Sequence, residues 1–376
     1  RLSLVGSEMC IRDSYGSSSN SLSHTSILSL HKDMQGNIWV GTYYGGVNVF
    51  NPDKNNHSFY CAEPLREDCL SFPVVGKMTE DSAGNVWICT EGGGLNCYHG
   101  DTGVFSRYMY HKGDQGTLGS NNVKSIFYRK ENNRLYAGTH LGGLFVLDLK
   151  SNKGHTLHHV TGDPASLPHE IVNDIQEYKD GIAMLTQGGP VFFDPVTEKF
   201  SPLTDDPSVQ KLISREYAFE TFLIDSRHRM WLAVGGGGIV CVNLSSSKVT
   251  QYMADSEKDT LTVGRYKTVH IFEDNKGDIY FSTIGAGIFK YQEKQDTFKS
   301  YGTTNGVLPS NYCYYICESA RDNCLLVLHG KGLSIFDREK EVTEETYHLF
   351  RQTYNLGSAL YRSKNGIIYI LSLIHI

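Results

Sequence analysis

The chain has 376 residues, of which 40% are hydrophobic, and it contains 38 Gly, 23 Tyr and only 10 Pro. Such a composition supports a large core and favours many short strands joined by tight turns over helices. The formal net charge of −6 comes without a block of like charges, which argues against a nucleic-acid footprint or a polybasic membrane patch. No apolar run reaches the length of about 18 residues that a membrane-spanning helix needs, and no signal-peptide pattern opens the chain.

The two ends of the chain differ from everything between them. Residues 1–14 and 371–376 fit no internal pattern and resemble translated sequencing adapters, so we exclude both from the fold and place the domain at 15–370. Residues 15–22 match residues 301–308, which predicts that the chain opens on the last strand of a lost repeat. Residues 365–370 match a second strand, so an eighth repeat begins there. We therefore interpret the chain as a fragment with partial blade strands at both ends.

The first complete unit predicts four short strands at 27–30, 38–42, 46–50 and 57–60. Links of only a few residues imply antiparallel neighbours. The first link carries Asp33, Gly36 and Asn37, where the carboxylate accepts backbone N–H bonds and the glycine tolerates a positive φ. The aspartate is therefore predicted to be structural and not catalytic.

The remaining units repeat the first with a nearly constant period. An anchor at Trp39 returns at intervals of 44 to 49 residues, at Trp87, Tyr136, Ala183, Trp231, Tyr280, Leu325 and Tyr369. A second anchor, a leucine five residues before a strand, recurs at Leu22, Leu70, Leu118 and Leu167. Two anchors with one period indicate a repeat architecture.

The apolar pattern of the units selects one architecture. Strands such as 38–40 and 86–88 are apolar at successive positions, so both of their faces must be covered. A repeated four-stranded sheet without a covering helix predicts an all-β fold, a seven-bladed β-propeller of four-stranded antiparallel blades. A helical solenoid of sheets is the alternative, but it needs capping units that the sequence lacks.

The two rims of such a propeller differ in sequence. The uniform rim carries the short Asp-Gly-Asn turns, whereas the variable rim carries the turns equivalent to 43–46 and long loops such as 61–73. Variation of this kind is typical of recognition surfaces. After the position equivalent to Thr42, the seven units place Tyr43, Glu91, His140, Gln187, Gly235, Ile284 and His329, and Tyr44 stands beside the first. A mixed aromatic and polar ring suits a sugar, and the alternative is that these residues only decorate turns.

Other chemistry-bearing residues form no recognisable site. Among nine cysteines, Cys61 with Cys69 and Cys89 with Cys97 are spaced for bridges in an oxidising compartment, but free thiols are the favoured interpretation. The histidines in 155–159 fall on an expected outer strand without an acidic cluster, and the glycines at 235–238 lack the Lys-Ser/Thr of a phosphate loop. We predict no catalytic residue, no metal and no cofactor.

Three segments carry a family resemblance: IWVGTYYGGVNVFNP at 38–52, VWICTEGGGLNCY at 86–98 and LYAGTHLGGLFVLD at 135–148. They resemble the two-component regulator propeller repeat of Bacteroides-type hybrid two-component systems. The copies decay at 182–194 and 324–337, and 356–370 resembles the closing repeat of such a propeller. The resemblance implies a periplasmic sensor region of an inner-membrane, homodimeric hybrid histidine kinase that detects oligosaccharides and signals by phosphorelay to glycan-utilisation genes.

Two other functions remain open from the sequence. One is a propeller lyase or glycosidase that uses His140 or His329 with a nearby acid, and the other is a scaffold that binds a protein on its rim. No kinase motif occurs in the chain, so this fragment is expected to bind a ligand, to bind no nucleic acid and to catalyse no reaction.

Overall fold

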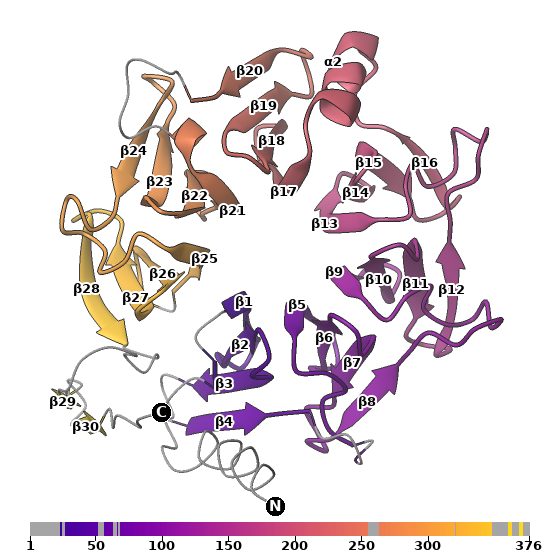
Figure 1. Ribbon diagram of the computed structural model, residues 1–376, viewed down its shortest axis with the longest axis horizontal. Coiled ribbons are helices and arrows are strands. Elements are labelled where there is room, and N and C mark those ends of the chain that lie inside the picture. Colours follow the sequence, from indigo (N-terminus) through magenta and orange to yellow (C-terminus); the bar gives the residue numbers. More distant parts are fainter. Residues whose placement is uncertain are drawn as a thin grey trace, which may run out of the picture.

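The computed structural model describes residues 23–24, 27–51, 56–62, 66, 68–254, 263–319, 321–347, 360–362 and 368–370. Within these residues the strands form seven four-stranded antiparallel sheets arranged in a ring (Figure 1). The fold is therefore the seven-bladed β-propeller that the repeat predicted. The two decayed repeats also form complete blades.

Each blade consists of four consecutive strands. Blade 1 contains β1 (Ile27–Lys32), β2 (Ile38–Thr42), β3 (Val47–Asn51) and β4 (Asn56–Tyr60), and blade 2 contains β5 (Val75–Glu80), β6 (Val86–Thr90), β7 (Leu95–Tyr98) and β8 (Phe105–Tyr108). Blade 3 contains β9 (Val123–Arg129), β10 (Arg134–Thr139), β11 (Leu144–Asp148) and β12 (Lys153–Leu157), and blade 4 contains β13 (Val172–Tyr178), β14 (Gly181–Thr186), β15 (Gly189–Asp194) and β16 (Lys199–Pro202). Blade 5 contains β17 (Phe219–Ile224), β18 (Arg229–Val234), β19 (Ile239–Asn243) and β20 (Val249–Tyr252). Blade 6 contains β21 (Lys267–Glu273), β22 (Ile279–Ile284), β23 (Gly287–Gln292) and β24 (Thr297–Tyr301), and blade 7 contains β25 (Cys313–Glu318), β26 (Cys324–His329), β27 (Gly332–Asp337) and β28 (Val342–Tyr347).

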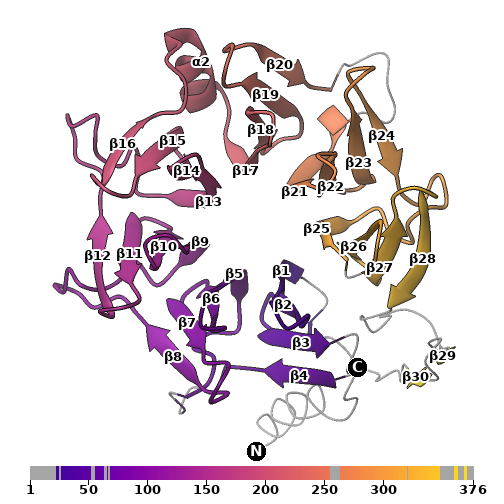
Figure 2. The same cartoon turned by 180° about the vertical axis from the view of Figure 1, so that it is seen from behind.

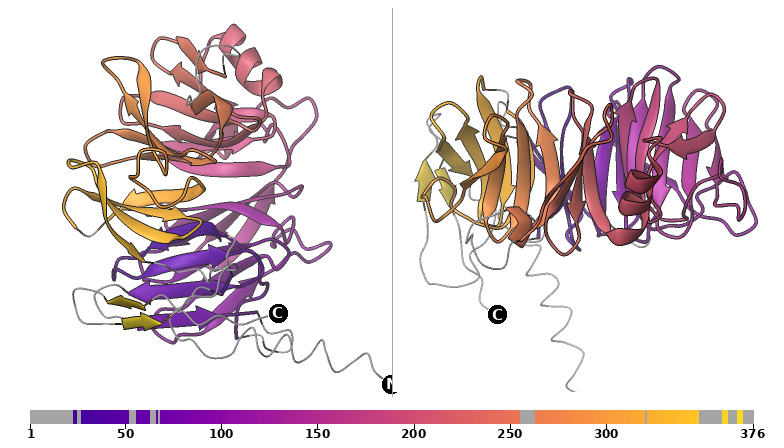
Figure 3. Two further views of the ribbon diagram at one scale, coloured as in Figure 1. Left: turned by 60° about the vertical axis from the view of Figure 1, so that its left-hand side comes forward. Right: turned by 90° about the horizontal axis from the view of Figure 1, so that it is seen from above.

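The first strand of every blade lies nearest the axis, and the fourth lies at the periphery (Figures 1 and 2). Seen from the side, the ring is a disc (Figure 3). Blade 7 contacts blade 1 through β25 and β1. A shared core containing Ile27, Leu30, Leu326 and Leu328 fills this junction. The ring is thus closed by side-chain packing between blades, with no strand exchanged.

The second strands form the buried centre of each blade. All residues of β2 and β6 are buried, which confirms that both faces are covered. Trp39 pairs with His31 on one side and Val49 on the other, and Trp87 holds the same place in blade 2. The sequence period therefore coincides with the blade period.

The aspartate turns are structural, as predicted. Asp33 Oδ1 accepts hydrogen bonds from the backbone N–H groups of Gln35 at 3.0 Å and Asn37 at 2.7 Å. Its Oδ2 atom accepts one from Trp39 Nε1 at 2.8 Å. The same indole bond, at 2.9 Å, joins Trp87 to Asp81 and Trp231 to Asp225. Each repeat tryptophan is therefore tied to the turn aspartate of its own blade.

One helical segment was not predicted. The helix α2 (Pro207–Lys211) and a π-helical turn (Leu212–Glu216) lie at the outer edge between blades 4 and 5 (Figure 1). Asp206 caps α2 by accepting from Ser208 N at 2.9 Å, while Val209 and Ile213 enter the core. A short 3-10 helix (Val263–Arg265) precedes β21. Throughout the described part of the chain, no helix combines the length and apolarity needed to cross a membrane.

The ends of the chain are only partly described. β29 (Leu360–Arg362) and β30 (Ile368–Ile370) pair in a two-stranded antiparallel sheet, and the start of an eighth repeat there stays a prediction. The strand predicted at 15–22 and the two excluded tails lie outside the described residues.

The cysteines form no bridge. Cys89 pairs with Leu95 and Cys97 pairs with Trp87, so the two thiols are not opposite each other across the strands. The eight cysteines of the described residues are free, so the bridged alternative is wrong for both pairs considered. Burial raises the pKa of the Cys97 thiol to about 12, which makes it unreactive in the folded protein.

Candidate functional site

The variable rim presents exposed aromatic side chains in the turn between β2 and β3. Tyr43 and Tyr44 are 40% and 55% exposed, and their rings meet edge to face with centroids 4.5 Å apart. Tyr44 has a φ of 66°, a conformation that bulky side chains rarely adopt. The backbone therefore holds an aromatic ring in solvent at the cost of local strain.

Blade 3 repeats this arrangement with an aliphatic residue. Leu141 occupies the turn position of Tyr44, with a φ of 60° and 65% exposure. The glycines that follow in both turns leave no room for side chains, since a Cβ on Gly46 would lie 2.2 Å from Tyr60 O and one on Gly143 would lie 2.2 Å from Leu157 O. Among the described residues, Tyr44 and Leu141 are the two large apolar residues that combine a positive φ with an exposed side chain.

A charged pair lies beside the tyrosines. Lys124 Nζ on β9 lies 2.6 Å from Glu91 Oε1, so the pair bridges blades 2 and 3. The hydrogen bond to Tyr44 raises the pKa of Tyr43, and the negative charge of Glu91 raises it further. The structure thus brings Tyr43, Tyr44 and Glu91 into one neighbourhood and adds Lys124, which the sequence did not single out.

Backbone hydrogen bonds fix the predicted ring positions next to the innermost strands. Glu91 N donates to Val74 O at 3.0 Å, and His140 N donates to Asn122 O at 2.9 Å. Gln187 N makes the equivalent bond to Ile171 O at 3.1 Å. Among the described residues, no side-chain hydrogen bond or ion pair joins His140 or Gln187 to the tyrosine group. Their part in a binding ring stays a prediction.

His329 does not belong to the ring, which corrects the sequence alignment. It pairs with Cys313 and Gly332, as Thr186 pairs with Val172 and Gly189 in blade 4, so it occupies the threonine position itself. Its side chain is 0% exposed and its Nε2 atom lies 2.7 Å from Ser334 Oγ. The residue that follows it in the turn is Gly330. A catalytic role for His329 is therefore wrong, because no substrate reaches it.

Every innermost strand carries a β-bulge near the variable rim. The register shifts between Ile27 and Ser29 in blade 1, and the other six blades shift at the equivalent place. Bulges re-aim side chains and are frequent next to functional sites. The residues that the register skips are Leu28, Gly76 with Lys77, Lys124, Asn173, Glu220, Val269 and Tyr314.

Deeper in the channel, polar side chains connect distant blades. Lys77 of blade 2 forms an ion pair with Asp174 Oδ1 of blade 4. The other oxygen of Asp174 accepts from Thr221 Oγ1 of blade 5 at 2.8 Å. These three residues cross the ring and were missed by sequence reasoning, because only the closed ring brings their strands together.

The opposite side of the channel is aromatic. His270 stacks on Tyr315 with ring centroids 3.8 Å apart. Burial, followed by the charge of Lys77, lowers the pKa of His270 to about 3. The imidazole is therefore neutral at physiological pH and acts as a flat packing surface.

Residues 21–44, which include β1 and β2, match the model of the family described as "Two component regulator propeller". Curated protein sequences include no match to the chain.

Solved structures confirm the architecture. PorZ, a bacterial surface component of the type-IX secretion system of Porphyromonas gingivalis, is 15% identical, with a TM-score of 0.61 over 83% of this chain and 46% of PorZ. The extracellular domain of the putative one component system BT4673 from B. thetaiotaomicron is 21% identical, with a TM-score of 0.36 over 92% of this chain and 46% of that domain. The extracellular domain of the putative hybrid two component system BT3049 is 16% identical, with a TM-score of 0.41 over 92% of this chain and 68% of that domain. The chain spans about half the length of BT4673's domain. The likeness to PorZ, at 15% identity, shows the fold alone.

Proposed function

We propose that this propeller is a ligand-binding part of a sensor ectodomain and that its variable rim binds an oligosaccharide. The observation that carries the proposal is the exposed Tyr43–Tyr44 pair near Glu91, which pairs with Lys124. Tyr44 is strained, as is the exposed Leu141 in the equivalent turn of blade 3. The regulator propeller repeat in blade 1 supports a sensor. Two B. thetaiotaomicron structures to which the chain is similar are described as extracellular domains of signalling systems, and the proposal gives this chain the same setting.

The chemistry of the rim suits a sugar. Tyrosine rings stack on the apolar faces of pyranoses, while a carboxylate and an ammonium group bond to hydroxyls. Glu91 and Lys124 are each about one-third exposed, so both keep polar atoms available at the surface. The channel beyond them is occupied by the Lys77–Asp174 pair, so a ligand would lie on the rim and not thread the ring.

Signalling requires more than binding. In the proposed parent, an inner-membrane homodimer with this region in the periplasm, the ligand shifts an equilibrium between two states only if it binds them with different affinities. The output domains would then pass the signal by phosphorelay. This chain would contribute the binding energy alone.

Calorimetric titration of the folded protein with plant and host glycan fragments tests the proposal. We expect one class of fragment to bind, the melting temperature to rise with its concentration, and the Tyr44→Ala variant to bind at least ten-fold more weakly. Met34→Ala is the matched control, because Met34 is an exposed apolar residue of the uniform rim. Equal loss of affinity in both variants, or no binding by any fragment, would contradict the proposal.

A further inference from the structure

Two seams between neighbouring blades share one aromatic frame on the uniform rim. Between blades 5 and 6, Trp231 stacks on Tyr252 at 6.2 Å and meets Tyr291 edge to face at 4.9 Å. Between blades 1 and 2, Trp39 stacks on Tyr60 at 6.2 Å and meets Tyr98 edge to face at 5.1 Å. Phe298 and Phe105 complete the two frames. We call these the 5/6 seam and the 1/2 seam.

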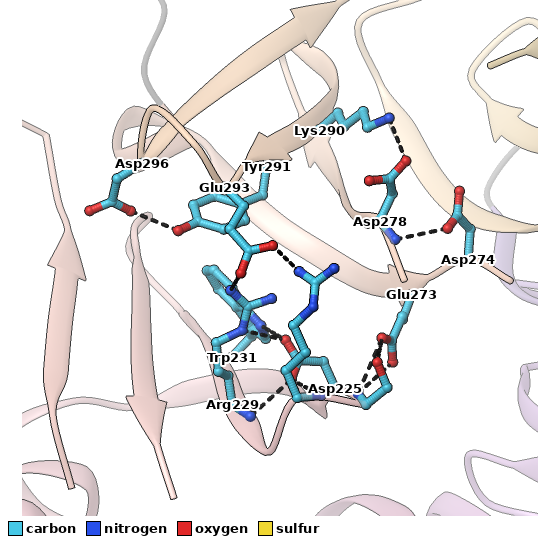
Figure 4. Close-up of polar contacts among 12 residues, drawn as sticks. Asp225, Arg229, Trp231, Glu273, Asp274, Asp278, Lys290, Tyr291, Glu293 and Asp296 are labelled. Carbon is cyan, nitrogen blue, oxygen red and sulfur yellow. Dashed lines mark hydrogen bonds and ion pairs between the residues drawn. The ribbon is translucent and has the colours of Figure 1, made fainter. Parts of the chain in front are cut away.

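An arginine fills the 5/6 seam. The guanidinium of Arg229 lies 5.1 Å from the centroid of Trp231 and 5.5 Å from that of Tyr291. Its Nε atom donates to Asp225 Oδ2 at 2.7 Å, and one terminal nitrogen lies 3.3 Å from Glu293 Oε1. Figure 4 shows Arg229 between these two carboxylates and beside Trp231. The frame therefore binds a guanidinium by cation–π contact and charge-assisted hydrogen bonds.

The 1/2 seam has the same arrangement of aromatic residues, but it has no counterpart of Arg229 or Glu293. Asn37 stands four residues after Asp33, as Arg229 stands four residues after Asp225, and Gly100 stands two residues after Tyr98, as Glu293 stands two residues after Tyr291. Both replacements are small, and the seam contains a cavity of about 160 Å³. Its lining comprises Asp33, Gln35, Asn37, Trp39, Tyr60 and Tyr98, together with Val49, Asn51, Ser58, Gly84, Val86 and Gly100.

The cavity has an uncompensated acidic character. The carboxylate of Asp33, a residue only 6% exposed, accepts hydrogen bonds from neutral donors, including Asn37 Nδ2 at 2.7 Å and Trp39 Nε1 at 2.8 Å. Glu80 lies beside this wall, since its Oε1 atom is 3.9 Å from where a Cβ on Gly84 would be. That oxygen is buried and has no hydrogen-bond partner. Among the described residues, no Lys or Arg pairs with Asp33 or Glu80.

We infer that the 1/2 seam is a binding site for a guanidinium-bearing ligand, which takes the place that Arg229 fills in the 5/6 seam. The flat cation would lie on Trp39 and Tyr98, with its N–H groups directed to the carboxylates of Asp33 and Glu80. The arginine side chain of a peptide and a free guanidino compound share this chemistry.

The size of the cavity limits what part of the ligand it takes. A buried water needs a cavity volume of only about 10–15 Å³, so a cavity of about 160 Å³ has room for several heavy atoms. Pockets that enclose drug-sized ligands measure about 300–1,000 Å³, so neither a whole sugar ring with its neighbours nor a large ligand is enclosed. The site accepts a head group and leaves the rest of the ligand outside.

This site is separate from the proposed oligosaccharide rim. It lies at the Asp-turn end of blades 1 and 2, whereas Tyr43, Tyr44 and Glu91 lie at the opposite ends of the same strands. Failure of one proposal would therefore leave the other untouched.

Titration with N-acetylarginine amide, against the neutral isostere N-acetylcitrulline amide, tests the inference. We expect the arginine compound to bind with a Kd on the order of 1 mM or tighter, and the citrulline compound to bind at least ten-fold more weakly. Agmatine and a short arginine-containing peptide then distinguish the sources: the peptide binds more tightly if backbone contacts outside the cavity contribute, and agmatine matches it if they do not. Either order supports the site.

Three variants locate the binding. Asn37→Arg supplies an internal guanidinium and should abolish binding, and Glu80→Gln should weaken it several-fold while leaving the Asp33 turn intact. Glu273→Gln is the matched control, because Glu273 binds Ser226 in the 5/6 seam as Glu80 binds Met34 in the 1/2 seam. Binding that is unchanged by Asn37→Arg, or absent in the folded wild-type protein, would overturn the inference. Lys54→Ala is measured as well, since Lys54 follows Asn51 closely in sequence; binding seen only in that variant would make the cavity an internal lysine site and also overturn it.

Discussion

The 1/2 seam and the 5/6 seam contain the same types of residue at equivalent positions, but they differ in the side chains that occupy the space between these residues. Both use a turn aspartate, a tryptophan tied to it, two tyrosines and a phenylalanine. One seam encloses Arg229 with Glu293, and the other leaves a cavity beside Asn37 and Gly100. The repeat thus preserves a frame whose function is set by one or two residues next to it.

The two seams also stabilise their buried aspartates in different ways. In the 5/6 seam a buried carboxylate and a nearly buried guanidinium depend on each other, so loss of one leaves a charge without its partner. In the 1/2 seam the aspartate is satisfied by neutral donors and the indole. Equivalent substitutions should therefore have unequal costs.

The largest effect is expected for Arg229→Ala. Asp225 has a side chain with 0% exposure, and the substitution would leave it without its cation, so we expect a loss of about 3–5 kcal/mol in the free energy of unfolding. Asn37→Ala removes a neutral hydrogen bond at the same place and should cost about 1 kcal/mol. Urea unfolding of both variants measures the contrast. Equal costs would show that the two seams do not differ as described.

A smaller effect is expected when the shared indole bond is removed. Trp39→Phe and Trp231→Phe each leave a buried carboxylate oxygen without its indole donor, which should cost about 1–3 kcal/mol. The loss should be greater for Trp231, because that ring also faces Arg229. Thermal unfolding followed by circular dichroism compares the stability of the two variants. A Trp231→Phe variant as stable as the wild type would contradict a stabilising role for the indole bond.

The smallest effect concerns Glu80 and depends on pH. Burial, and then the charges of Asp33 and Asp81, raise the pKa of Glu80 above its ordinary value. The folded state therefore holds this proton more tightly than the unfolded state, so the ionised carboxylate destabilises the fold at neutral pH and protonation relieves the penalty as pH falls through the raised pKa. Glu80→Gln should stabilise the protein at pH 7 by less than about 1 kcal/mol, because the group is partly solvated.

The same variant supplies its own control at low pH. The advantage of Glu80→Gln over wild type should shrink towards zero below the ordinary glutamate pKa, since both side chains are then neutral. Glu273→Gln should instead destabilise at neutral pH, because both oxygens of Glu273 accept hydrogen bonds, from the backbone N–H and the hydroxyl of Ser226, whereas Glu80 Oε1 accepts none. A Glu80→Gln advantage that persists unchanged in acid would contradict this reading of the 1/2 seam.

Much of the fold could be predicted because the signals that define each repeat come from residues close together in the sequence. The blade period follows from the position of Trp39 and its copies, and the role of Asp33 follows from turn chemistry within five residues. The His329 error arose because Leu325 was aligned with Trp39, whereas the strand register places Leu326 there. Counting back from the turn-closing Gly332 would have placed His329 correctly. The helix after Asp206 also carried a signal, an N-cap aspartate followed by Pro207, but a propeller pattern gives no reason to expect a helix there.

The sites between blades could not be predicted in the same way. The pairing of Lys77 with Asp174 and of Trp39 with Tyr98 depends on which strands the closed ring brings together. The cavity of the 1/2 seam results from small residues on two different blades. In an alignment of the repeats, Asn37 and Gly100 are two unrelated differences from the other blades, and nothing shows that they face the same space.

The most direct test is an NMR titration that observes the three tryptophan indole N–H signals of the chain. With N-acetylarginine amide as ligand, the Trp39 signal should shift and saturate, because its ring lines the open cavity. The Trp231 signal should stay in place, because Arg229 already occupies its seam, and Trp87 should not respond either. An unmoved Trp39 signal, or equal shifts of Trp39 and Trp231, would contradict the account.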